Sequence, residues 1–225
     1  MNPDQTQTVS DLTSVLIVDD HDLVRRGLAA LIEADPQLEI CGNAADVDTA
    51  MELVRQTSPK LIIVDISLKA SNGLDLIKRV HAHDEDIKML VSSMHDEMIH
   101  AERALKAGAN GYIHKEVAAE KVLEAIHSVL EGNVYLSERM EKHVLQNLSK
   151  NNGEVESDMS RLSDRELEVF EMIGRGMKTR EIADSLHLSV KTVDTYRDTI
   201  KKKLTLDSGA ELVCRAVRWV VEEGG

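Results

Sequence analysis

Polar groups that could do chemistry together follow four short apolar segments in the first half of the chain. They are Asp19 and Asp20, Asp65, Ser93 and Lys115, which follow the segments 15–18, 61–64, 89–91 and 111–114. Short apolar runs of this length are typical of buried strands. The carboxyl ends of parallel strands meet at one edge of an open sheet, and ligands bind there. We therefore expect these side chains to lie close together.

Three carboxylates, a hydroxyl and an ammonium group predict a magnesium-dependent phosphoryl site. Mg²⁺ prefers oxygen ligands, which Asp19, Asp20 and Asp65 could supply together with the backbone carbonyl of Ser67. A carboxylate can also act as a nucleophile and form an acyl phosphate. Each residue alone has a simpler interpretation, such as a helix cap or a solvated lysine. The combination at four strand ends favours the phosphoryl site.

The elements that position these groups alternate between strand and helix. The predicted strands are 14–19, 38–42, 60–65, 87–93 and 111–114, and the predicted helices are 22–33, 47–56, 73–81, 97–106 and 118–130. Five such units with short loops predict an α/β fold with a doubly wound, five-stranded parallel sheet covered by helices on both faces.

Composition divides the chain into two parts. The 225 residues are 42% hydrophobic but only 2% aromatic, so the core must be aliphatic. The net charge is −13, and residues 160–225 hold 12 basic and 12 acidic residues, so the whole excess of acid lies before residue 160. This distribution argues against a protein that coats nucleic acid with its entire surface. It predicts two domains with different partners.

We predict four regions: a disordered tail (1–13), the α/β domain (14–133), a linker with a short helix at about 137–148 (134–159), and a small all-α domain (160–225). The two cysteines, Cys41 and Cys214, provide no disulfide framework or metal-ligand spacing, which is typical of a reducing cytoplasm. No membrane-spanning segment or signal peptide is evident. We therefore expect a cytoplasmic protein.

The second half predicts a helix-turn-helix. Ser163 and Glu166 form a capping box that begins one helix. A short helix over 179–186 and a turn at 187–188 precede a longer helix over 190–204. Two helices joined in this way read DNA in many proteins. The candidate DNA contacts are Lys178, Thr179, Arg180, Lys191, Thr192, Thr195, Tyr196, Arg197, Asp198 and Lys202. The alternative is a helical module that binds another protein, with these charges solvated.

The first half resembles a response-regulator receiver domain. The resemblance covers about residues 14–130 and lies in Val18-Asp19-Asp20-His21, in Val64-Asp65-Ile66, in Ser93-Met94-His95-Asp96-Glu97 and in 107–115. It implies that Asp65 is the phospho-acceptor, that Asp19, Asp20, Asp65 and the Ser67 carbonyl hold Mg²⁺, that Ser93 and Lys115 contact the phosphate, and that Tyr112 is a switch residue. Lys69 and Glu116 depart from the residues that are common in this family.

The second half resembles a LuxR-type domain over about residues 160–225, through the motifs at 162–169, 178–183, 190–197 and 203–204. Together the two halves are similar to a NarL/FixJ-type transcriptional response regulator. The resemblance implies a sensor histidine kinase and promoter DNA as partners, a homodimer on DNA, and phosphorylation of Asp65 that controls transcription. It implies no catalytic turnover beyond the protein's own phosphorylation and dephosphorylation.

The residues also bear on three other interpretations. A haloacid-dehalogenase-type enzyme needs a second aspartate two residues after its nucleophile, where this chain has Ser67. A signalling adaptor would use residues 160–225 to bind protein instead of DNA. A zinc site is not expected, because the nine histidines are scattered and His81 and His83 lack helical ligand spacing.

Overall fold

The computed structural model describes residues 12–68, 72–95, 97–142 and 158–223. Several predictions concern residues outside these ranges. They are most of the predicted tail and linker, the departure at Lys69, and the second half of the helix predicted over 137–148. Within the described ranges, residues 138–142 are helical. The predicted domain boundaries at residues 133 and 160 therefore stay predictions.

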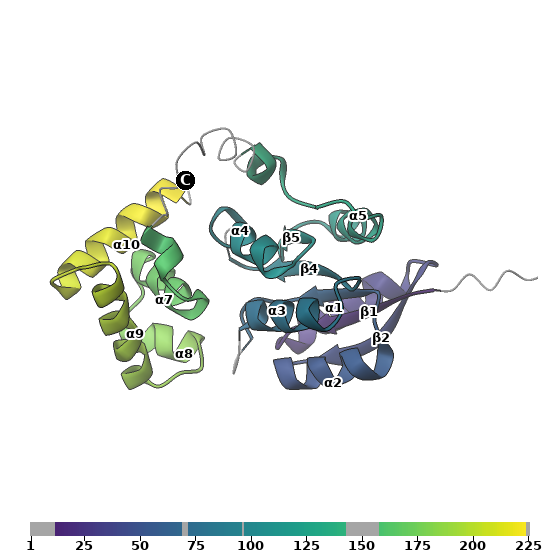
Figure 1. Ribbon diagram of the computed structural model, residues 1–225, viewed down its shortest axis with the longest axis horizontal. Coiled ribbons are helices and arrows are strands. Elements are labelled where there is room, and N and C mark those ends of the chain that lie inside the picture. The colour runs from purple at the N-terminus through teal and green to yellow at the C-terminus, as the bar shows by residue number, and fades with distance from the viewer. Residues whose placement is uncertain (1–11, 69–71, 96, 143–157, 224–225) are drawn as a thin grey trace, which may run out of the picture.

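A five-stranded parallel sheet forms the centre of the first domain (Figure 1). The strands are β1 (Thr13–Val18), β2 (Leu38–Ala44), β3 (Leu61–Val64), β4 (Lys88–Ser93) and β5 (Gly111–His114), in the spatial order β2-β1-β3-β4-β5. The predicted fold class is confirmed, and the predicted strand bounds differ from these by at most a few residues. The order places β3 between β1 and β4, and β5 beside β4. The polar groups follow the carboxyl ends of these four strands, so these ends adjoin one another.

Helices cover both faces of the sheet, because the side chains of each strand alternate between two apolar layers. Leu16 and Val18 of β1 pack in one layer with α2 (Val47–Thr57), α3 (Gly73–His83) and α4 (Glu97–Ala107). The intervening Val15 and Ile17 pack in the other layer with α1 (Asp22–Glu33) and α5 (Ala119–Leu130). Both layers are largely aliphatic, as the composition predicts.

In the residues described, the second domain contains helices joined by turns and no strand. It contains the 3₁₀ turn η1 (Asp158–Arg161) and helices α7 (Asp164–Gly174), α8 (Thr179–Ser185), α9 (Val190–Lys203) and α10 (Gly209–Glu223). The predicted capping box is present, since the Ser163 amide donates to Glu166 Oε2 at 2.7 Å and the Glu166 amide donates to Ser163 Oγ at 3.4 Å. Its core contains apolar residues from all four helices, among them Leu167, Phe170, Ile182, Val193 and Leu212.

Helix α10 packs along a narrower seam than its apolar stripe suggests. Leu212 and Ala216 are fully buried, whereas Val213 and Val217 expose 39% and 40% of their surface. Val213 and Val217 therefore lie at the edge of the packed seam. The seam is close because Gly174 ends α7 against α10, where a Cβ atom would lie 2.5 Å from the Ala216 carbonyl oxygen.

The two domains contact each other through α3 and α4 on one side and α7 with the segment before it on the other (Figure 1). Among the helices described, none is long and apolar enough to span a membrane. Cys41 is half-buried, Cys214 is exposed, and both are free thiols.

Candidate functional site

Three carboxylates gather at the carboxyl edge of the sheet, as the sequence predicts. Asp19 and Asp20 follow β1 and Asp65 follows β3, and the Asp65 amide donates to the Val18 carbonyl at 2.8 Å, which aligns the two strand ends. Asp19 and Asp65 are each only 2% exposed. One ligand atom from each carboxylate, together with one from His21, lies within 4.8 Å of the others. The clustering of these groups follows directly from the strand order.

Lys115, which follows β5, reaches into this cluster. Its Nζ lies 2.7 Å from Asp65 Oδ2 and 2.6 Å from Asp19 Oδ2. Burial lowers the pKa of Lys115, but the two carboxylates outweigh burial and hold it above its ordinary value. Burial and the neighbouring carboxylate of Asp19 raise the pKa of Asp65 above its ordinary value, although the ammonium group of Lys115 lowers it.

The three carboxylates of this cluster suit Mg²⁺, because this ion prefers oxygen ligands. The Ser67 amide donates to Asp65 Oδ1 at 3.1 Å, so the chain turns back toward the acceptor just after β3. This turn keeps the backbone of Ser67 beside the cluster. Magnesium coordination by Asp19, Asp20, Asp65 and the Ser67 carbonyl remains a prediction.

Ser93 and Tyr112 lie close to the same segment of chain. Ser93 ends β4, is fully buried, and its Oγ accepts a hydrogen bond from the His95 amide at 3.1 Å. Tyr112 is 1% exposed, and its hydroxyl donates to the His95 carbonyl at 3.0 Å. Burial raises the pKa of Tyr112, so the phenol stays protonated. Both predicted switch residues thus hold the segment after β4 through the backbone of His95.

Gly73 determines how closely α3 approaches Asp65. A Cβ atom at this position would lie 2.0 Å from the Asp65 carbonyl oxygen. The Gly73 amide donates to the Ile66 carbonyl at 2.8 Å, and the Asn72 side chain caps α3 by accepting from the Leu74 amide at 2.8 Å. Only glycine therefore permits this path of the chain after Asp65.

The second domain covers the acidic edge. A cavity of about 250 Å³ lies between the domains and is lined by Asp65, Lys115 and His95 from the first domain and by Arg165, Glu168 and His187 from the second, among others. Arg103 of α4 ties the domains together, because its guanidinium donates to the carbonyls of Met159 and Leu162 at 2.6 and 2.9 Å and to Asp164 Oδ1 at 2.9 Å. Lys78 of α3 also lies 3.2 Å from Asp164.

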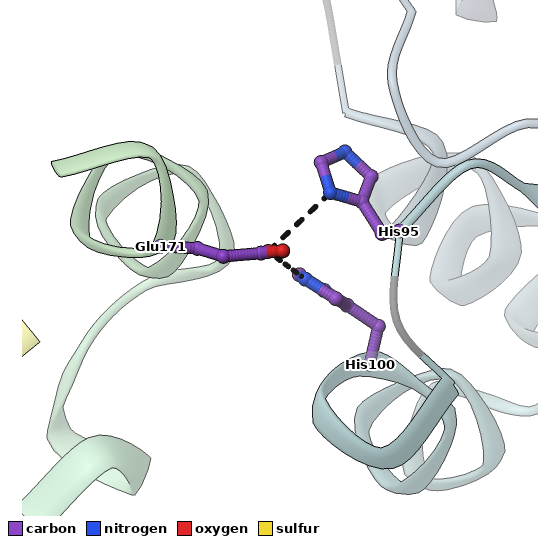
Figure 2. A group of neighbouring side chains, drawn as sticks. All are labelled: His95, His100 and Glu171. Atoms are coloured by element: carbon purple, nitrogen blue, oxygen red, sulfur yellow. Dashed lines mark hydrogen bonds and ion pairs between the residues drawn. The ribbon is translucent and has the colours of Figure 1, made fainter. Parts of the chain in front are cut away.

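Two histidines and two glutamates meet at this interface, and sequence reasoning missed all four. Figure 2 shows three of them, His95, His100 and Glu171. Glu171 Oε2 lies 2.8 Å from His100 Nε2 and 3.4 Å from His95 Nδ1, while Glu168 Oε1 lies 3.5 Å from His95 Nε2. Ser67 Oγ is 2.6 Å from the same His95 Nε2. A chain of contacts therefore connects the residue two positions after Asp65 to α7.

The electrostatics of this interface differ between its two histidines. Burial lowers the pKa of His95, but hydrogen bonds to Glu168 and Glu171 outweigh it and raise the pKa to about 9. Burial lowers the pKa of the more enclosed His100. Burial alone would raise the pKa of Glu171, yet the two histidines hold it well below its usual range. The glutamate is thus a buried anion that faces two imidazoles.

The predicted helix-turn-helix corresponds to α8 and α9. The turn between them passes through His187 with φ of 53°, and Ser189 caps α9 by accepting from the Thr192 amide at 3.0 Å. Val193 and Ile200 face the core and are fully buried. The predicted contacts that are exposed are Lys178, Arg180, Lys191, Thr195, Asp198 and Lys202, and those that are half-buried are Thr179, Thr192, Tyr196 and Arg197. Lys201 pairs with Asp198 at 2.9 Å and lowers its pKa.

Each half of the chain matches a known protein family. Residues 15–127 match the response regulator receiver domain, and residues 160–216 match the bacterial regulatory proteins of the luxR family. Response regulator UvrY of Escherichia coli (strain K12) is 32% identical over 208 residues, which cover 92% of this chain and 94% of UvrY. Response regulator GacA of Pseudomonas aeruginosa is 33% identical over 207 residues, which cover 92% of this chain and 96% of GacA.

Solved structures share the fold. A two-component response regulator of the LuxR family from Aurantimonas sp. SI85-9A1 is 28% identical with a TM-score of 0.57, covering 61% of this chain and 99% of that chain. RcsB of Salmonella typhimurium is 22% identical with a TM-score of 0.62, covering 92% of this chain and 98% of that chain. The chain therefore belongs to the two-component response regulators that join a receiver domain to a LuxR-type DNA-binding domain.

Proposed function

We propose that a sensor histidine kinase phosphorylates Asp65 and that this modification controls binding of promoter DNA by the second domain. The observation that supports the proposal best is the contact of Lys115 with both Asp65 and Asp19 beneath a cover formed by α7. The site contains a nucleophile, a cation for the phosphoryl oxygens and a structural element that the phosphate would disturb.

The chemistry follows from the contacts of Asp65. A carboxylate oxygen of Asp65 attacks the phosphorus atom, and the bond from phosphorus to the kinase histidine breaks with its electron pair kept by the departing imidazole. Lys115 exchanges its contact with Asp65 Oδ2 for one with a phosphoryl oxygen. Ser93 would donate to a second phosphoryl oxygen. Mg²⁺ bound by Asp19, Asp20, Asp65 and the Ser67 carbonyl would offset the negative charge during transfer.

The acyl phosphate would weaken the contact between the domains. It adds up to about two negative charges at a position close to Glu168, whose Oε1 is 3.4 Å from Ser67 Oγ. Like charges in a partly buried space repel strongly, because little water screens them. The segment after β4, held by Ser93 and Tyr112 through His95, would rearrange at the same time. We infer that these changes shift a pre-existing equilibrium toward separated domains.

We further infer that separated domains bind DNA as a homodimer, with α9 in the major groove of each half-site. RcsB has been solved as two dimers bound to two parallel DNAs, and this chain shares its fold. The exposed Lys178, Arg180, Lys191 and Lys202 would neutralise phosphates. Such a protein acts in the cytoplasm, where its kinase domain partner and its promoters are found.

Phosphorylation of the full chain by a small-molecule phosphodonor with Mg²⁺ tests the acceptor. We expect one phosphoryl group on the native chain and none on Asp65→Asn, measured by intact mass and phosphate-affinity electrophoresis. Asp48→Asn is a matched control, because Asp48 is 92% exposed on α2 and pairs only with Arg79 among the contacts described. Persistent labelling of Asp65→Asn would show that the acceptor is a different residue.

Selection of genomic fragments by the native chain with and without phosphodonor tests the output. We expect the phosphorylated protein to enrich specific fragments and to bind them more weakly as salt rises. Equal enrichment before and after phosphorylation would separate DNA binding from the modification of Asp65.

A further inference from the structure

His95, His100 and Glu171 converge on one point between the two domains (Figure 2). His95 lies in the segment after β4, His100 is in α4, and Glu171 is in α7, so the three come from both domains. One ligand atom from each lies within 4.8 Å of the others. His100 and Glu171 are 3% and 1% exposed, so the point at which they meet is largely shielded from solvent.

We propose that His95, His100 and Glu171 form a binding site for a divalent transition-metal ion, with Zn²⁺ as the expected occupant, that joins the two domains. Imidazole nitrogens and a carboxylate oxygen are ordinary zinc ligands. The proposal concerns metal binding alone and does not require that Asp65 be phosphorylated.

Two of the distances between the ligand atoms are close to those of a zinc site. Zinc–ligand bonds of about 2.0–2.2 Å place the ligand atoms of a tetrahedral site about 3.3 Å apart. His95 Nδ1 and Glu171 Oε2 are already 3.4 Å apart, and His100 Nε2 is 2.8 Å from the same oxygen. His100 must therefore move back by about 0.5 Å to admit the ion.

The ring of His95 is already oriented as a metal ligand requires, and the ion would displace the proton from Nδ1, because a metal binds the neutral imidazole. A ligating histidine usually has its second ring nitrogen fixed by a carboxylate, a carbonyl or another polar group. Here Nε2 of His95 contacts Ser67 Oγ at 2.6 Å and lies 3.5 Å from Glu168 Oε1, which leaves Nδ1 directed at Glu171. Arg165 Nη1 in turn forms an ion pair with Glu168 Oε2 at 2.6 Å. The second carboxylate of α7 thus supports the ring instead of competing for the ion.

The proposed site is chemically distinct from the acidic edge near Asp65. An all-oxygen set selects Mg²⁺, whereas two imidazole nitrogens favour Zn²⁺, Co²⁺ and similar ions. Because His95 and His100 lie in the first domain and Glu171 lies in the second, a bound ion would by mass action stabilise the arrangement in which the two domains touch. Bound metal would therefore oppose separation of the domains.

Titration of the metal-free full chain with Co²⁺ in excess Mg²⁺ tests the proposal, because Mg²⁺ fills the acidic edge and Co²⁺ reports its ligands by visible absorption. We expect one equivalent of Co²⁺ with the spectrum of nitrogen and oxygen coordination, displaced by Zn²⁺. His100→Gln and Glu171→Gln should each weaken binding by at least about tenfold. Loss of Co²⁺ binding in both variants would show that the site spans the two domains, since His100 lies in the first domain and Glu171 in the second.

Matched variants separate ligation from folding. His187→Gln changes an exposed histidine of the second domain, and Glu166→Gln changes a buried glutamate of α7 that pairs with Lys203 at 2.6 Å. Both should bind Co²⁺ like the native chain, and circular dichroism should show that every variant is folded. If His100→Gln is unfolded, the Co²⁺ affinity of Glu171→Gln alone tests the site.

Two results would overturn the site: no Co²⁺ binding by the native chain in excess Mg²⁺, or unchanged affinity in folded Glu171→Gln. Asp65→Asn provides an independent check, because it should lose phosphorylation yet keep the Co²⁺ spectrum. Loss of the spectrum in Asp65→Asn would instead assign the ion to the acidic edge.

Discussion

Arg103 offers the most direct way to separate the two domains without altering either site. Its guanidinium makes three hydrogen bonds to the second domain, to the carbonyls of Met159 and Leu162 and to Asp164. Arg103→Met removes these bonds but leaves a long, unbranched side chain at the same position of α4. We therefore expect the variant to fold normally and to populate the separated form more often.

The size of the shift can be estimated from these contacts. A hydrogen bond to a charged group contributes about 1.5–3 kcal/mol when it is well buried. Arg103 and Asp164 are 20% and 19% exposed, and Arg103 regains water when the domains separate. A total of about 2 kcal/mol is therefore reasonable for the three bonds together. This corresponds to an increase of about thirtyfold in the ratio of separated to closed molecules.

The rate of phosphorylation of Asp65 by a small-molecule donor measures this ratio, because Asp65 is 2% exposed in the closed arrangement. If the donor reaches Asp65 only in separated molecules, the rate rises in proportion to their fraction and levels off once they predominate. Scattering measurements of molecular size on the unphosphorylated protein should show the same change. Both measurements require only the full chain.

Lys106→Met is the matched control, since Lys106 is on the same helix, is 74% exposed and pairs only with Glu102 among the contacts described. Its rate should equal that of the native chain. An unchanged rate in Arg103→Met, with scattering that detects separated domains, would refute the argument that α7 restricts access to Asp65. An unchanged rate and unchanged size would refute the energy assigned to Arg103.

Three further substitutions test other parts of the structure. Gly73→Ala would place a Cβ atom 2.0 Å from the Asp65 carbonyl, so we expect a loss of about 3 kcal/mol in the free energy of unfolding. A native-like urea midpoint would show that α3 can shift freely. Ser163→Ala removes the cap of α7 and should cost about 1 kcal/mol in the same assay, and a larger loss would indicate that the cap also holds the interface. Lys202→Ala should lower the slope of log affinity against log salt by about one on specific and random DNA alike, and a loss confined to the specific sequence would assign Lys202 to base recognition.

The acidic edge was predictable because a parallel sheet obeys strict rules. Four apolar segments fix four strands, and right-handed crossovers bring their carboxyl ends together. Asp65 and Lys115 are 50 residues apart in the chain, yet Lys115 Nζ is 2.7 Å from Asp65. No knowledge of side-chain packing is needed to place them together. The capping box at Ser163 was predictable for a similar reason, since it depends on residues three positions apart.

The interface was not predictable, because it depends on how two separately folded units meet. Glu168 and Glu171 resemble solvated positions of an amphipathic helix, yet they are 4% and 1% exposed. Histidine spacing was also uninformative, because His95 and His100 find their common partner 71 residues beyond His100. The exposure of Val213 and Val217 on α10 was not predictable either, since a periodic apolar stripe does not specify how much of it a neighbouring helix will cover.

The position of α9 has a consequence for how such a switch operates. Lys191, Thr195 and Lys202 face solvent even though α7 is docked on the receiver domain. These predicted DNA contacts of α9 are therefore accessible in the closed arrangement. Docking of α7 on the receiver domain would then set the distance and angle between the two α9 helices of a dimer. Regulation would therefore act on the symmetry of the dimer more than on the exposure of either α9 helix.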